Sequence, residues 1–225
     1  MKANMKNDRT AIITLVGLAA MTALTAIKAA TSSQLASAAL VISGLAFFFI
    51  VEGVAKTPDA ESGLSFKRFG SDLKKPWVIP LILLLIALTL LELFLDKLLF
   101  GSALAEHVVG RVSIMSSKDI PMVLLNQIFV VLGEEIGFRG FFVGKGMKLF
   151  PFWPVALVSA AVFALAHLTA GPAAIVACDV AQIFIDALLF ALLYRKTGNC
   201  LISCIPHFVC NMLGYFLLPI IYGLG

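Results

Sequence analysis

The chain is built from long apolar runs separated by short polar segments, and this pattern limits its fold more than any other feature. A helix needs roughly 20 apolar residues to cross the hydrocarbon core of a bilayer. The runs cover residues 11–27, 34–51, 77–100, 120–148, 151–168, 173–194 and 200–222. Only 13% of the 225 residues are charged, against about 25% in a soluble domain. We therefore expect an all-α, polytopic integral membrane protein of about seven transmembrane helices, with residues 1–225 forming a single membrane domain.

The first run has two interpretations. It follows a short basic segment that contains Lys2, Lys6 and Arg9, and the stretch around Ala29 and Ala30 resembles a cleavage site. These features are also those of a secretory signal peptide. Because the remainder is polytopic and needs no separate export signal, we expect a retained first span.

The basic residues alternate between the two sides of this predicted bundle. With the N-terminus inside, the outer side carries only Lys28, Lys97, Arg111 and Lys118 out of 17 Lys and Arg. The inside segments carry Lys2, Lys6, Arg9, Lys56, Lys67, Arg68, Lys74, Lys75, Arg139, Lys145, Lys148, Arg195 and Lys196. Cytoplasmic loops are enriched in Lys and Arg, so we expect the N-terminus inside and the C-terminus outside. The short chain with small loops is typical of a prokaryote, and we expect it in the inner membrane.

The fourth run begins with the helix-start signal Ser117-Lys118-Asp119-Ile120-Pro121, and Glu134, Glu135 and Arg139 lie in its middle. Glu135 and Arg139 are four residues apart, where an ion pair forms readily on a helix. Glu134 is left without a partner nearby in the sequence, and a carboxylate of that kind suits general acid–base work. The alternative is that both glutamates are solvated at a cytosolic helix end.

Two later runs carry histidines. His167 lies near the end of the fifth, and His207 lies in the seventh with Asn211 one turn further along. Ionisable residues inside a membrane usually face a protein interior or a cavity. At 1.5 Å per residue, the depths of these groups and of Glu134 are compatible with one cluster. Hydrogen bonding between helices is the alternative for each of them.

The sixth run and the start of the fourth add further polar residues. Asp179 and Asp186 are seven residues apart and share one helix face, where they would line a cavity or a proton path, or bond to a neighbouring helix. Asn126 and Gln127 are expected at the mouth of the cavity. The four cysteines, at positions 178, 200, 204 and 210, lie in apolar stretches, and we expect free, buried thiols.

Taken in order, Glu134-Glu135-x-x-x-Arg139, Phe163-x-x-x-His167 and His207-x-x-x-Asn211 resemble the three-motif signature of the CAAX prenyl protease and bacteriocin-processing family, also called the Abi family. The match covers roughly Ile120 to Gly214, and we place the protease-like core at about 120–222. One departure is Gly137, where bulkier residues are usual.

The resemblance implies an intramembrane endopeptidase that needs no cofactor. Glu134 would be the general base that activates a water, and His167 would help to hold that water. His207 and Asn211 would stabilise the oxyanion, while Glu135 with Arg139 would form a structural ion pair. The implied partners are a peptide or membrane-protein substrate and the lipid bilayer, with no nucleic acid. Since water must reach the site, we expect a cavity that opens to the cytosolic side.

Three alternatives remain open at this point. Glu134, His167 and His207 would serve as zinc ligands with water in the fourth position, although the sequence has no His-Glu-x-x-His helix. A non-catalytic bacteriocin-immunity or scaffold protein would keep the fold without the chemistry. A small transporter would use Asp179 and Asp186 as proton carriers, but transporters usually show repeated halves, and we find none.

Overall fold

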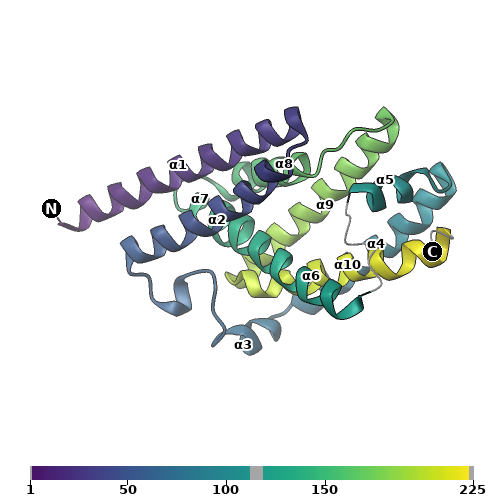
Figure 1. Ribbon diagram of the computed structural model, residues 1–225. Helices are drawn as coiled ribbons and strands as arrows, with labels where there is room; N and C mark the ends of the chain where they lie inside the picture. Colours follow the sequence, from purple (N-terminus) through teal and green to yellow (C-terminus); the bar gives the residue numbers. More distant parts are fainter. Residues whose placement is uncertain (1, 112–118, 223–225) are drawn as a thin grey trace.

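The computed structural model describes residues 2–111 and 119–222, and every regular element in this part of the chain is a helix (Figure 1). In chain order these are α1 (Lys2–Thr31), α2 (Gln34–Ala55), the 3₁₀ helix η1 (Asp59–Glu61), α3 (Phe69–Leu73), α4 (Val78–Phe100), α5 (Ala103–Arg111), α6 (Ile120–Glu135), a π-helical segment (Ile136–Val143), α7 (Gly144–Gly146), α8 (Phe152–Ala166), α9 (Ala173–Thr197) and α10 (Cys200–Tyr222). The expected all-α fold is confirmed.

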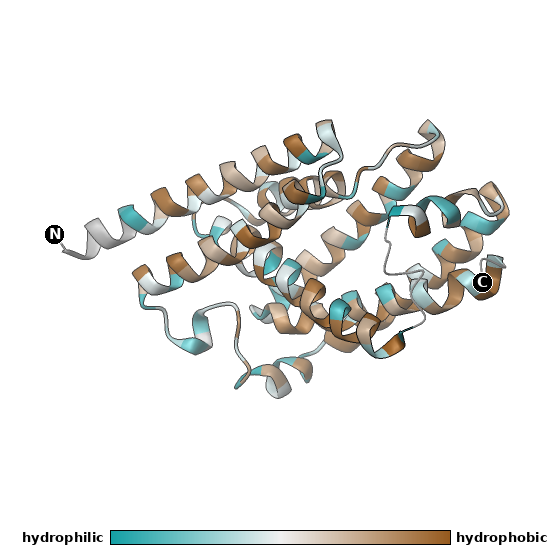
Figure 2. Cartoon of the chain, viewed as in Figure 1, coloured by the Kyte–Doolittle hydropathy of each residue, from teal (hydrophilic) through white to brown (hydrophobic). Residues whose placement is uncertain are grey.

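Six of these helices, with α6 to α7 counted as one, are long and apolar enough to cross a membrane, and α8 is a shorter apolar helix. The polytopic prediction is therefore confirmed. Large apolar side chains such as Leu35, Ile42, Phe94 and Ile220 are exposed on the helix surfaces. Hydrophobic residues predominate along the long helices (Figure 2). Water does not stabilise such a surface, whereas lipid does.

The helix boundaries follow from local capping. Asp119 accepts a hydrogen bond from the backbone N–H of Met122 at 3.1 Å, and Pro121 lies in the first turn of α6, as the helix-start signal predicts. Gly198 ends α9 with φ of +63°, a conformation that favours glycine. The loop between α4 and α6 contains α5, and the rest of this loop, residues 112–118, lies outside the described residues.

The N-terminal helix is packed into the bundle. Met21 on α1 is fully buried in the main core, together with Leu40 and Phe48 of α2. Lys28, near the C-terminal end of α1, donates a hydrogen bond to the carbonyl of Leu168 at 3.3 Å. The first apolar run therefore contributes to the same core as the later helices.

The fourth span is a single rod from Ile120 to Gly146, but its middle is not regular. All eight residues of the π-helical segment 136–143 are buried. A π-helical turn widens the helix and changes the direction of the side chains that follow it, and such segments are frequent at functional sites. This one begins directly after Glu134 and Glu135.

Two glycines allow α2 to cross this rod at close range. A Cβ atom added to Gly44 would lie 2.8 Å from the Cα of Gly137, and one added to Gly137 would lie 3.4 Å from the Cα of Gly44. Small residues let membrane helices approach closely. The departure noted at Gly137 has a physical reason, since a Cβ atom there would already be in van der Waals contact with the backbone of α2 and a bulkier side chain would have to displace it.

The polar linker between α2 and α4 folds back under the junction of α9 and α10. Asn199 is fully buried there. Its amide donates to the carbonyl of Ser65 at 2.8 Å and to Asp72 at 3.0 Å, while its oxygen accepts from the N–H of Ser65 at 3.2 Å. The backbone N–H of Cys200 also donates to the carbonyl of Gly63 at 2.8 Å. The linker is thus fixed against the end of the bundle that carries the basic loops.

Candidate active site

Glu134 lies on the last turn of α6, and its side chain is only 14% exposed. Its Oε2 atom lies 3.5 Å from Nε2 of His207 on α10. This ionisable partner comes from another helix, as expected for a group without a partner nearby in the sequence. The alternative of two solvated glutamates is wrong, because the neighbouring Glu135 is fully buried.

Glu135 connects two site residues rather than one. Its Oε1 atom lies 3.0 Å from Nη1 of Arg139, as predicted, and also 2.8 Å from Nδ1 of His207. Because a carboxylate can only accept a hydrogen bond, Nδ1 of His207 carries the hydrogen and is the donor in this bond to Glu135. Nε2 of the same ring then faces Glu134. The sequence indicated the pair with Arg139 but not the contact with His207.

Arg139 is buried within the site and is not a loop charge, which corrects its place among the inside charges. Its side chain is 1% exposed. Nη2 donates to the carbonyl of Ala187 at 3.3 Å, and the guanidinium lies over the rings of Phe163 at 4.7 Å and Phe190 at 5.0 Å. A buried Arg needs partners of this kind, and here they join the fourth span to α8 and α9.

His167 directly follows α8 as its C-terminal cap. Its Nδ1 lies 2.8 Å from the carbonyl of Phe163, and since a carbonyl can only accept, Nδ1 is the donor. The ring also packs on that of Phe163, with centroids 4.8 Å apart. Nε2 is therefore the nitrogen of His167 that can act as an acceptor.

Asn211 lies one turn after His207 on α10 and contacts the fourth span. Its amide nitrogen donates to Oε1 of Gln127 at 3.0 Å. Gln127 was expected at the mouth of the cavity and does line it. The bond between the two amides orients Asn211 and leaves its second N–H for another acceptor.

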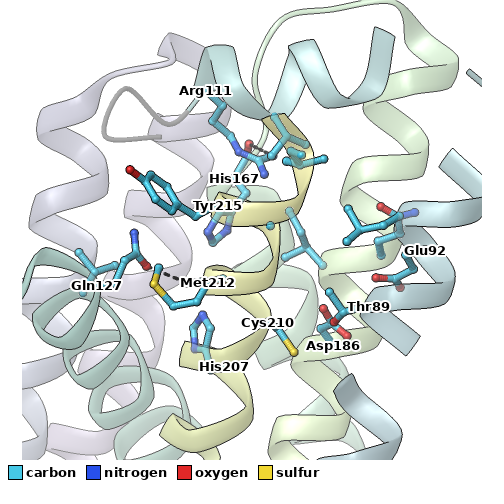
Figure 3. A pocket seen from close by; sticks show the side chains of 18 of the residues that line it. Thr89, Glu92, Arg111, Gln127, His167, Asp186, His207, Cys210, Met212 and Tyr215 are labelled. Carbon is cyan, nitrogen blue, oxygen red and sulfur yellow. Dashed lines mark hydrogen bonds between the residues drawn. The ribbon is translucent and has the colours of Figure 1, made fainter. Parts of the chain in front are cut away.

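The four predicted catalytic residues share one cavity of about 360 Å³, and Glu134, His167, His207 and Asn211 all line it. Figure 3 shows His207 at one end of this cavity and Arg111 at the other. The wall between them also contains carboxylate side chains from α4 and α9, namely Glu92, Asp96 and Asp186. The structure thus brings together the groups that the three motifs predict.

The two aspartates of α9 have different surroundings. Asp179 forms an ion pair with Arg111 of α5 and lies 3.6 Å from Nε2 of His107, so it bonds to a neighbouring helix. Asp186 lines the cavity. Arg111 also donates to the carbonyl of His167 at 3.4 Å. Arg111 therefore borders the site, although the sequence indicated only a topological charge.

A zinc site would need three protein ligands around one point. Among the described residues, no three or more His, Cys, Asp or Glu side chains are arranged to hold a metal ion. Of the alternative ligands, Glu134 and His207 lie 3.5 Å apart, and His167 keeps Nε2 open because its Nδ1 is bonded to the carbonyl of Phe163. The residues do not fit a metal in this geometry, and we derive no step through one.

The cavity lies at the end of the bundle away from the N-terminus. Its lining includes Leu104, Val108 and Arg111 of α5, Gln127 and Glu134 of α6, and residues of α10 as far as Leu218. Figure 1 shows α5 and the C-terminus together at the end opposite the N-terminus. A cytosolic N-terminus and a cytosolic opening of the cavity were both expected. Because the cavity and the N-terminus lie at opposite ends of the bundle, the two expectations cannot both be correct.

Comparison with known proteins gives one match. Residues 116–213 match the family model described as type II CAAX prenyl endopeptidase Rce1-like, a segment that contains all three motifs. This match confirms the resemblance found in the sequence. No curated protein and no solved structure matches the chain.

Proposed function

We propose that the chain is an intramembrane endopeptidase that hydrolyses peptide bonds with a glutamate-activated water. Residues 116–213 match the family model described as type II CAAX prenyl endopeptidase Rce1-like, which supports this proposal. One observation carries the proposal. Glu134 and His207 face each other across 3.5 Å at the cavity wall, and the buried Glu135 holds the far side of the His207 ring.

Glu134 is the general base. Its carboxylate takes a proton from a water molecule while the water oxygen attacks the carbonyl carbon of the substrate. The same proton then passes to the nitrogen of the leaving amine, which returns Glu134 to its starting state. His167 accepts the second hydrogen of the water at Nε2 and fixes the direction of attack, since its Nδ1 is bonded to Phe163.

The carbonyl oxygen gains negative charge in the tetrahedral intermediate and needs fixed donors. Asn211 offers the amide N–H that Gln127 does not use. His207, when protonated at both nitrogens, donates from Nε2, and its bond from Nδ1 to the carboxylate of Glu135 fixes the direction of the ring. The apolar surroundings strengthen both contacts.

Glu135 and Arg139 are positioning residues in this scheme. Arg139 neutralises Glu135 and ties it to α8 and α9 through the rings of Phe163 and Phe190. The ion pair therefore sets the position of His207 without contact with the substrate.

The test compares the purified wild-type chain, Glu134→Gln and Glu61→Gln on a library of quenched fluorescent peptides in detergent. Glu61 is exposed in η1 and serves as the matched control. We expect Glu134→Gln to lose at least about 100-fold in rate and Glu61→Gln to keep the wild-type rate. Cleavage by Glu134→Gln at the wild-type rate, or loss of wild-type activity to a zinc chelator, would overturn the mechanism.

A further inference from the structure

We infer that the cavity is entered from the extracytoplasmic side, so that the substrate is a polypeptide segment that reaches the outer leaflet from outside the cell. That the polypeptide in the cavity is a substrate rests on the proposed function. The side from which the cavity is entered does not rest on it.

The distribution of basic residues orients the bundle. The loops at the end opposite the cavity carry Lys56, Lys67, Arg68, Lys74, Lys75, Lys148, Arg195 and Lys196. The described residues at the cavity end carry only Lys28, Lys97 and Arg111. An excess of Lys and Arg marks the cytoplasmic side. The cavity end is therefore the extracytoplasmic end.

The few cations at the cavity end are engaged within the protein. Lys28 donates to the carbonyl of Leu168, Lys97 donates to the carbonyl of Ile221 at 2.8 Å, and Arg111 pairs with Asp179. The linker cations at the other end lie partly in contact with the bundle, where Lys75 donates to the carbonyl of Thr197 at 3.0 Å. Cations at both ends thus bond within the protein, and the two ends differ in the number of basic residues that they carry.

The basic end is closed by packed layers between the linker and His207. The linker bonds through Asn199 to Ser65 and Asp72, and the exposed fractions of these three residues are 0%, 1% and 1%. The next layer toward the site contains Ile202 and Ser203, both fully buried. The ion pair of Glu135 and Arg139 lies above that layer and is also buried.

The cavity end, by contrast, has two hollows that reach the site. The cavity of about 360 Å³ extends from His207 to Arg111 and Leu218. A second one of about 180 Å³ is bordered by Lys28 and Gln34. Glu134 and His167 line both of them. Water and a peptide therefore have space to approach Glu134 from this end.

Three glycines permit a test with single cysteines. A Cβ atom added to Gly70 in α3, to Gly110 in α5 or to Gly214 in α10 meets nothing within 4 Å. Gly70 lies at the basic end, Gly110 lies at the cavity end, and Gly214 lines the cavity itself. Each cysteine variant is expressed in bacterial cells whose inner membrane is accessible, and a charged, membrane-impermeant thiol reagent is added before or after lysis.

We expect Gly110→Cys and Gly214→Cys to react before lysis and Gly70→Cys to react only after it. The wild-type chain gives the background of the four native cysteines. Reaction of Gly70→Cys before lysis, with Gly110→Cys protected, would overturn the orientation. Reaction of Gly214→Cys only after lysis, with Gly110→Cys reactive before it, would overturn access to the cavity from outside. Val108→Cys, also in the cavity wall, replaces Gly214→Cys if the latter does not accumulate.

The labelling pattern is independent of peptide cleavage. If Glu134→Gln cleaves like the wild type while the labelling is as expected, the proposed chemistry fails and the orientation stands. If the labelling is reversed and Glu134→Gln is inactive, the chemistry stands and the substrate comes from the cytoplasm.

Discussion

The crossing of α2 over the fourth span should tolerate no side chain at Gly44. A Cβ atom there would lie 2.8 Å from the Cα of Gly137 and 3.2 Å from Cε of Met21. Carbon atoms prefer a separation of about 3.5–4.0 Å, so α2 has to move by about 0.7 Å to reach the lower limit. Met21 can turn its flexible end away, whereas the backbone of Gly137 cannot.

The matched control is Gly53→Ala on the same helix, where an added Cβ atom meets nothing within 4 Å. Both substitutions gain about 1 kcal/mol of helix propensity, and this gain cancels when the two variants are compared. Overpacking costs about 1–3 kcal/mol. The free energy of unfolding of Gly44→Ala should therefore be about 1–3 kcal/mol lower than that of Gly53→Ala. The value for Gly137→Ala, with its looser 3.4 Å contact, should lie between these two values.

The measurement is unfolding in mixed micelles of a mild detergent and SDS, followed by the fluorescence of Trp77 and Trp153. The three alanine variants are compared with the wild type at equal protein and detergent concentrations. Equal unfolding free energies for Gly44→Ala and Gly53→Ala would refute the close crossing. Such a result would also remove the physical reason given for glycine at position 137.

Two further predictions concern charges. Glu135→Gln should lower the unfolding free energy by about 3–5 kcal/mol, because Arg139 stays buried without its counter-charge. The substitution should also slow cleavage. Equal unfolding curves for the wild type and this variant would contradict the prediction. Burial alone would raise the pKa of Asp72, but hydrogen bonds from Lys75, Asn199 and Arg68 outweigh this effect and hold the pKa below its ordinary value of 3.8. Ionised Asp72 therefore stabilises the fold above that pH, and the stabilisation is lost as the pH falls through the lower pKa of the folded state. Asp72→Asn should cost about 1–3 kcal/mol at neutral pH, and the difference from wild type in chemical unfolding should shrink below about pH 4.

The sequence indicated the membrane fold and the composition of the site for physical reasons. Apolar runs must become helices in lipid, because each backbone polar group needs a partner there. The seventh run was expected at residues 200–222, and α10 has the bounds Cys200–Tyr222. The three motifs named Glu134, His167, His207 and Asn211, and these residues line one cavity.

Other features depend on contacts that no local pattern contains. The bond from His207 to Glu135 joins α10 to the fourth span, and the i,i+4 rule suggested only the partner Arg139. The closure of the basic end depends on Asn199, whose partners Ser65 and Asp72 lie far away in the chain. Counting charges by segment included Arg139 among the charges on the inside, because such a count does not show that Arg139 is buried in the π-helical segment.

The shortness of α8 has a consequence for the surrounding lipid. Its 15 residues span about 22 Å, whereas the hydrocarbon core is about 30 Å thick. Trp153, Leu157 and Val158 on this helix are exposed, so α8 meets the bilayer directly. A helix that is too short is accommodated by local thinning of the membrane. His167 stands at the end of this short helix, and the hydrophobic mismatch brings the water boundary closer to this proposed catalytic group than a full-length span would.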